Sequence, residues 1–125
     1  MKVLNLTQHA GSVDQTGLVE PSAEQKKRII ALISFEEIPS LEEMETRAQE
    51  LAKMASGYSA VMIGGAPYFQ APLERALLKI GVKPLYAFSK RESVDERLPD
   101  GSVRKTTVFR HVGWVAPYGL PPKNV

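Results

Sequence analysis

Apolar residues along this chain follow two patterns in turn, short continuous runs and helical spacings. Runs at 3–6, 60–63 and 84–88 predict buried β-strands. Between the first two runs lies a segment in which apolar residues recur every three or four positions, which is typical of an amphipathic helix. These residues are Leu41, Met44, Ala48, Leu51 and Ala55.

Capping signals place the first two helix starts. Ser22 is followed three residues later by Gln25, and Ser40 by Glu43, and both pairs fit the capping-box pattern. The first helix is therefore expected to start near Pro21 and to run to about 34.

A third helix is expected around 70–80. Pro72 is tolerated only in a first turn, so the helix should start near Gln70 or Ala71. Gly81 followed by Val82 predicts a Schellman ending.

The order of these segments predicts the fold. Strands alternating with helices favour a mainly parallel sheet with right-handed crossovers. Pro99-Asp100-Gly101 is a turn between 93–98 and 103–115, which predicts a C-terminal antiparallel hairpin. We therefore expect a single Rossmann-like α/β domain over 1–116, followed by an irregular, proline-rich tail over 117–125.

Composition narrows the class of protein. A chain of 125 residues fits one domain. Because cysteine is absent, disulfides, zinc–thiolate sites and thiol nucleophiles are excluded, and a reducing cytoplasm is favoured. No apolar run approaches the roughly 20 residues of a membrane span, and the start is too polar for a signal peptide. We expect a cytoplasmic protein without a membrane partner.

The charge is small overall but unevenly distributed. The net charge of +2 does not predict a long nucleic acid as partner, whereas the region from Ser89 onward is rich in lysine and arginine. This skew favours a small anionic partner.

Three polar clusters follow the predicted strands. In a parallel sheet, ligands bind beyond the carboxyl ends of the strands, so these clusters should meet there. They are Thr7-Gln8-His9, Gly64-Gly65 and Ser89-Lys90-Arg91. Glycines let a ligand approach the backbone, and the free amides at the following helix start favour an anion. The expected ligand is nucleotide-like.

The residue types limit the chemistry. The sequence has two histidines far apart and no cysteine, so we expect no metal site. It contains no serine-hydrolase elbow, and because it also contains no dinucleotide-binding or Walker motif, we expect no cofactor. Histidine is the side-chain type that ordinarily titrates near neutrality, so His9 is the candidate acid–base group. With Lys90 and Arg91 stabilising developing charge, this set fits metal-free cleavage of an RNA phosphodiester by its own 2′-hydroxyl. The other residues of the three clusters would bind the ligand, namely Thr7, Gln8, Gly64, Gly65 and Ser89.

Each cluster also fits a structural role. The two glycines fit a plain tight turn, the histidine a polar strand end, and the cationic pair a solvated loop. Arg110 and His111, on the last strand, fit an edge ion pair, and whether they face the ligand crevice stays open.

In this plan, the chain resembles the CRISPR-associated Rossmann fold (CARF) domains and the small ring nucleases related to them, over most of 1–115. The resemblance implies a homodimer that binds cyclic oligoadenylate across its two-fold axis and cuts it without a metal. Thr7 would match the family's hydroxyl residue after the first strand, and Lys90 or Arg91 its basic residue near a later strand end. Gly64-Gly65 would lie in the ligand loop between them. The segments 5–9 and 62–67 also look like those of short bacterial proteins without an assigned function.

Other classes of function remain open. The same crevice fits a non-catalytic module that binds a nucleotide or phosphate. A nucleoside or sugar-phosphate enzyme would need a carboxylate nucleophile, for which Glu74 and Glu92 are the candidates. A protein-interaction domain would use an apolar patch around Tyr68-Phe69 and Trp114.

Overall fold

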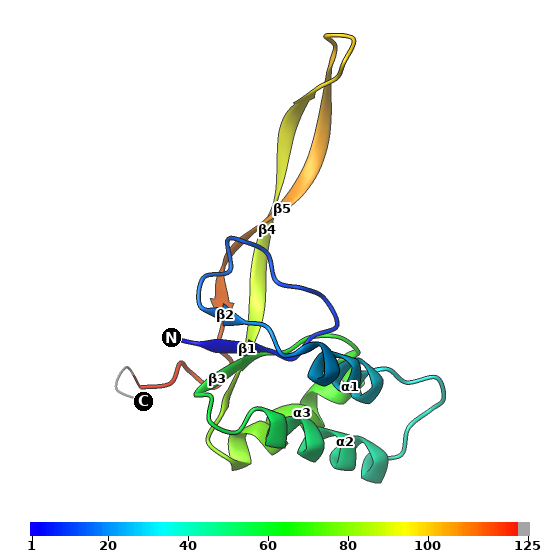
Figure 1. Cartoon of the computed structure of the whole chain (residues 1–125), viewed down its shortest axis with the longest axis vertical. Coiled ribbons are helices and arrows are strands. Elements are labelled where there is room, and N and C mark those ends of the chain that lie inside the picture. The colour runs from blue at the N-terminus through cyan, green and yellow to red at the C-terminus, as the bar shows by residue number, and fades with distance from the viewer. Residues whose placement is uncertain (123–125) are drawn as a thin grey trace.

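The computed structural model describes residues 1–122, and Figure 1 shows its elements in chain order. These are β1 (Val3–Asn5), β2 (Leu18–Val19), α1 (Ala23–Ile33), α2 (Leu41–Met54), β3 (Ala60–Met62), α3 (Pro67–Lys79), β4 (Lys83–Arg97) and β5 (Val103–Val115).

The strands form one sheet of mixed direction. Their order is β2-β1-β3-β4-β5, in which the first four are parallel and β5 is antiparallel to β4. The last register row shared by β1, β3 and β4 is Asn5, Met62 and Leu85. The prediction of an α/β fold with a mainly parallel sheet and a C-terminal antiparallel hairpin is confirmed.

Alternating strand residues bury both faces of the sheet. The three helices cover one face, where Leu4, Val61 and Ile63 pack against apolar residues of all three helices. On the other face, β2 and the C-terminal segment cover a smaller cluster without a helix. It comprises Val3, Ala60, Met62 and Leu85, packed by Leu18, Trp114 and Ala116.

The predicted caps of α1 and α3 form as expected. Ser22 and Gln25 make both hydrogen bonds of a capping box. After α3, Gly81 adopts a φ of 79°, and the N–H of Val82 donates to the carbonyl oxygen of Leu77 at 3.0 Å. This is the Schellman geometry.

For α2, Ser40 caps the first turn by accepting a hydrogen bond of 3.0 Å from the N–H of Glu43. The carboxylate of Glu43 pairs with Arg47, one turn on.

The predicted start of α3 was wrong. The helix begins at Pro67, and Pro72 lies in its interior. Pro67 is preorganised for the first helical position, and the missing N–H of Pro72 removes a single intrahelical bond that tertiary burial of Pro72 compensates.

Two further segments differ from the prediction. No strand was predicted between the run at 3–6 and the first helix, but the short strand β2 lies there. The strand expected to end at Phe88 continues without a break to Arg97, so 89–93 is strand and not loop. Hydrogen bonding to β5 replaces the parallel neighbour that β4 loses beyond Leu85.

The irregular tail was predicted over 117–125, and the structure describes it as far as residue 122. Residues 117–122 contain no helix or strand, and 123–125 lie outside the described residues. Over the described chain, no helix has the length and apolar character needed to span a membrane.

Candidate functional site

The first two polar clusters lie side by side at the carboxyl edge of the sheet. Thr7 and Gly64 each stand two positions beyond the shared row of β1 and β3. A methyl group added to Gly64 would lie 3.8 Å from Cγ2 of Thr7. The expectation that these clusters meet is therefore fulfilled for Thr7 and Gly64.

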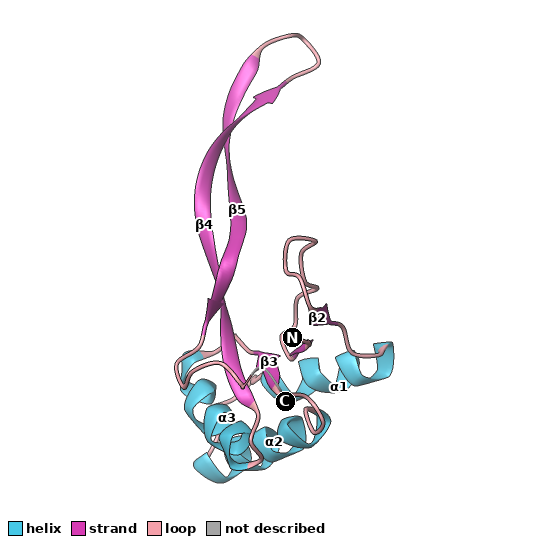
Figure 2. Cartoon of the chain, turned by 90° about the vertical axis from the view of Figure 1, so that its left-hand side faces the viewer, coloured by secondary structure: helices cyan, strands magenta, loops and turns pink. Residues whose placement is uncertain are grey.

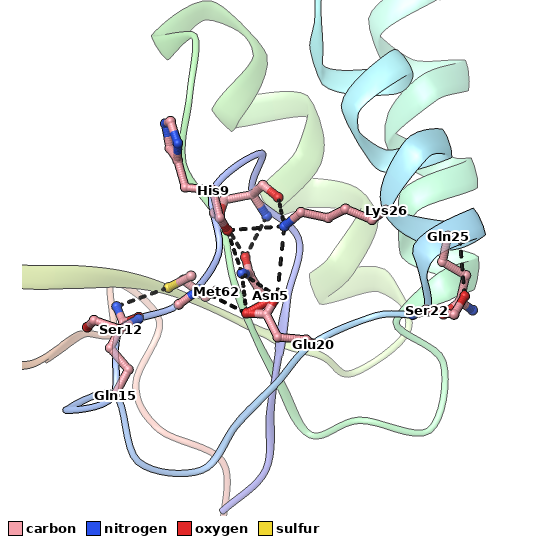
Figure 3. A network of polar contacts seen from close by, with 11 residues as sticks. Asn5, His9, Ser12, Gln15, Glu20, Ser22, Gln25, Lys26 and Met62 are labelled. Atoms are coloured by element: carbon pink, nitrogen blue, oxygen red, sulfur yellow. Dashed lines mark hydrogen bonds and ion pairs between the residues drawn. The ribbon is translucent and has the colours of Figure 1, made fainter.

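A buried asparagine shapes the turn after β1. The side chain of Asn5 is fully buried, and its Oδ1 accepts hydrogen bonds from the N–H of Thr7 at 2.9 Å and from its hydroxyl at 2.7 Å. Its Nδ2 donates to the carbonyl oxygen of His9 at 2.8 Å. The side chain of Asn5 thus holds the backbone of residues 7–9 in place by hydrogen bonds at both ends of this segment (Figure 3).

Glu20 and Lys26 complete this network from outside β1. Oε1 of Glu20 accepts from Nδ2 of Asn5 and from the N–H of Gly11, both at 2.9 Å. Nζ of Lys26 donates to the carbonyl oxygen of Thr7 at 2.7 Å and to that of His9 at 3.1 Å. Partial burial by itself raises the pKa of Glu20, but the hydrogen bonds from Asn5 and Gly11 and the charge of Lys26 lower it overall.

The imidazole of His9 points away from this network and is exposed (Figure 3). Its Nε2 lies 3.3 Å from Nε2 of Gln8. Because an amide nitrogen only donates, this contact is a hydrogen bond when Nε2 of His9 carries no proton. In that arrangement the lone pair of Nε2 is held by the side-chain amide of Gln8.

The turn between β3 and α3 leaves backbone amides available. Gly65 has a φ of 113°, in the region that favours glycine, and no side chain caps the N-terminus of α3. Gln70 reaches back to this turn, where its Nε2 donates to the carbonyl oxygen of Ala66 at 3.0 Å. Its Oε1 is buried and has no hydrogen-bond partner among the described residues.

The third cluster lies on the hairpin. Ser89, Lys90 and Arg91 pair in register with His111, Arg110 and Phe109 of β5. Because successive strand residues point to opposite faces, Lys90 shares the face of Tyr86 and of the helices, whereas Arg91 points to the other. The structure therefore does not bring Lys90 and Arg91 to one side of the sheet.

The carboxylates considered as nucleophiles are both engaged. Glu74 accepts hydrogen bonds from the hydroxyl groups of Tyr86 at 2.5 Å and of Tyr118 at 2.9 Å. Burial, and then the bond to Glu74, raises the pKa of Tyr86 well above its usual range. Glu92 pairs with Arg110 at 2.5 Å.

The aromatic residues of the proposed interaction patch do not form one surface. Phe69 is buried in the core, and Tyr68 is about half exposed against Phe35. Trp114 packs edge-on against the ring of His111 at the base of the hairpin, with 4.8 Å between centroids.

A groove of about 740 Å³ lies elsewhere, between α2 and α3, and its lining includes none of the residues in the three polar clusters. In the described part of the chain, no group of three His, Cys, Asp or Glu side chains is placed to hold a metal ion.

Sequence reasoning missed Asn5, Glu20 and Lys26. Asn5 carried a signal, because a polar residue inside an otherwise apolar strand run is unusual and needs a buried partner. Glu20 and Lys26 carried none, since they lie 15 and 21 positions from Asn5 along the chain.

Comparison with known proteins places the chain in a family. The family model described as the uncharacterized protein MJ1673 family matches residues 1–115, and the chain belongs to this family. The comparisons with curated proteins and with solved structures gave no match.

Proposed function

We propose that this member of the MJ1673 family binds a nucleotide-like phosphate ligand at the carboxyl edge of its parallel sheet and cleaves a cyclic oligoadenylate there without a metal ion. The observation that carries the proposal is the contact of two preorganised turns, the Asn5-held turn at 7–9 and the glycine turn at 64–65. Such a site costs little reorganisation when a ligand binds.

The glycine turn supports phosphate binding. At the start of α3, Pro67 has no N–H and the N–H of Phe69 donates to the carbonyl oxygen of Ala66. This leaves the amides of Ala66 and Tyr68 at the positive end of the helix dipole, which favours an anion. The hydroxyl of Thr7 already donates its proton to Asn5 but keeps lone pairs that accept from a ligand hydroxyl.

His9 supports cleavage by acting as the base. Once the side-chain amide of Gln8 has moved away, the unprotonated Nε2 of His9 would take the proton of a ribose 2′-hydroxyl, whose oxygen then attacks the adjacent phosphorus. The bond from phosphorus to the 5′-oxygen breaks, and that oxygen leaves with a proton from the imidazolium or from water. The products are linear oligoadenylates that end in a 2′,3′-cyclic phosphate.

Lys90 is the cation that we assign to this reaction. It lies on the sheet face from which α3 starts, and it makes no ion pair with a carboxylate among residues 1–122. It stands three positions beyond the row of Thr7 and Gly64, or about 10 Å along the strand, a distance that a nucleotide spans.

The test is to incubate the full chain with cyclic tetra- and hexa-adenylate in the presence of EDTA and to separate the products by chromatography. Linear products with a 2′,3′-cyclic phosphate would support the proposal. We expect His9→Ala to lower the cleavage rate about 100-fold or more while binding is retained. Lys27→Ala, on the exposed surface of α1, is the control for Lys90→Ala.

The outcomes separate the candidate functions. A cyclic oligoadenylate that binds but stays intact would favour the non-catalytic binding module, which the preorganised turns also fit. Absence of both binding and cleavage would overturn the proposal and leave the two turns as architecture.

A further inference from the structure

The hairpin beyond the sheet forms an arm, defined here as residues 89–111. From Ser89 to Arg97, β4 pairs only with β5, over nine register pairs, which span about 30 Å at the ordinary rise of a strand. The arm projects from the rest of the chain (Figures 1 and 2). A two-stranded hairpin alone in water is marginally stable. The length of the arm therefore indicates a partner.

The two faces of the arm differ in how their charges are satisfied. One face, the Lys90 face, carries two ion pairs, Arg104 with Glu96 at 2.8 Å and Arg110 with Glu92. The carboxylates of this face, Glu92 and Glu96, therefore already have cationic partners within one copy.

The opposite face, the Arg91 face, carries no ion pair among residues 1–122, although Asp95 and Lys105 are register partners of opposite charge. Its three central rows hold Arg91, Ser93, Asp95, Lys105, Thr107 and Phe109, because register partners share a face and neighbours along a strand alternate. Among residues 1–122, Arg91 and Asp95 make no ion pair. Phe109 is 68% exposed, with the guanidinium of Arg91 5.6 Å from its ring centre.

We propose that the Arg91 face binds the same face of a second copy of this chain, with the two arms antiparallel. The two-fold axis passes through the row of Ser93 and Thr107, where small side chains allow close approach. Arg91 and Asp95 lie on this face on either side of Ser93, two residues from it along β4. In the dimer, Arg91 of each copy therefore meets Asp95 of the other.

The same alignment of the two arms also gives the residues of β5 favourable partners. Phe109 of one copy meets Lys105 of the other, which is a favourable cation–π arrangement. At the next row, Ser89 meets Arg97 and His111 meets Val103, so no like charges face one another. This self-complementary pattern is what a two-fold interface between identical chains requires.

Charge complementarity favours a second copy over a nucleic acid. A phosphate backbone is matched by an unbroken basic surface, whereas Asp95 lies at the centre of the Arg91 face, and Glu92 and Glu96 lie on the other. The inference does not depend on the proposed function, because it uses neither His9 nor Lys90.

The test is the mass of the full chain in solution, measured by light scattering and sedimentation over a concentration series. The wild-type chain should be a dimer. Arg91→Asp should raise the dissociation constant about tenfold or more, because two exposed ion pairs become two acid–acid contacts. Asp95→Arg should do the same, and the double variant with both substitutions should restore the dimer.

Lys90→Asp is the matched control, since it makes the same change of charge on the adjacent residue of the other face, and it should leave the dimer intact. A circular dichroism spectrum like that of the wild type shows that each variant is folded. Because the chain has no cysteine, Ser93→Cys introduces a single thiol, which should form a disulfide-linked dimer on oxidation.

Three results would overturn the proposal. They are a wild-type chain that is monomeric at all concentrations, a double variant that fails to restore the dimer, and a monomer whose arm captures a labelled oligonucleotide.

Discussion

Asn5 and Glu20 are joined by a hydrogen bond of 2.9 Å between Nδ2 of the amide and Oε1 of the carboxylate. Asn5 ends β1, and Glu20 directly follows β2, so this bond continues the pairing of the two strands through side chains. Together with Lys26 it holds the loop that carries Thr7 and His9.

Asn5→Ala should lower the free energy of unfolding by about 1–3 kcal/mol, because it removes the hydrogen bonds of this buried amide to Thr7, His9 and Glu20 and leaves the part-buried N–H of Thr7 without its acceptor. Urea-induced unfolding measures the change. Gln49→Ala, on the exposed surface of α2, is the control and should have little effect. An equal loss in both variants would contradict the role of Asn5.

Glu20 should make stability depend on acid pH. Its pKa is lowered in the folded chain, so its contribution is present above the unfolded value of about 4.3 and is lost as the pH falls through the folded value. Glu20→Gln keeps an acceptor oxygen but removes the titration. Urea midpoints between about pH 3 and 7 should therefore fall less steeply for Glu20→Gln than for the wild type. Parallel curves would show that Glu20 does not contribute.

Tyr86 should make the fold sensitive to alkali. Its pKa is raised in the folded chain, so stability is lost as the pH rises past the unfolded value of about 10. Tyr86→Phe cannot ionise and should flatten the dependence on pH above that value. Tyr68→Phe, at an exposed tyrosine, should keep the wild-type slope.

The two glycines after β3 should respond differently to alanine. Gly65→Ala should cost about 1–2 kcal/mol of stability, because its φ of 113° is strained for any residue with a Cβ. Gly64→Ala should change stability by less than about 0.5 kcal/mol, since the new methyl group meets Thr7 at an ordinary contact distance. The same methyl group should nevertheless weaken ligand binding. Equal thermal shifts for the two variants would contradict this assignment.

Local signals in the sequence predicted the parts of the fold that depend on neighbouring residues. The caps at Ser22 and Gly81 and the turn before Gly101 belong to this class, since a few adjacent residues determine each of them. Thr7 and Gly64 were placed together because parallel strands deliver their carboxyl ends to one edge.

Other features depend on partners distant in sequence and left no local signal. The continuation of β4 through Ser89 depends on pairing with β5, which carries Lys90 and Arg91 out onto the arm and separates them. The start of α3 at Pro67 depends on burial of the interior Pro72, which outweighs the intrinsic preference against proline. The roles of Glu20 and Lys26 emerge only once β2 lies beside β1.

The register shift between Phe88 and Ser89 separates the sheet from the arm. Near this point the loop after β1 also contacts the hairpin, where Asp14 accepts a hydrogen bond of 3.0 Å from the N–H of His111. Within one copy, therefore, the arm is attached to the rest of the chain at its base, and a small rotation at the register shift would displace the turn at Gly101 by a larger distance.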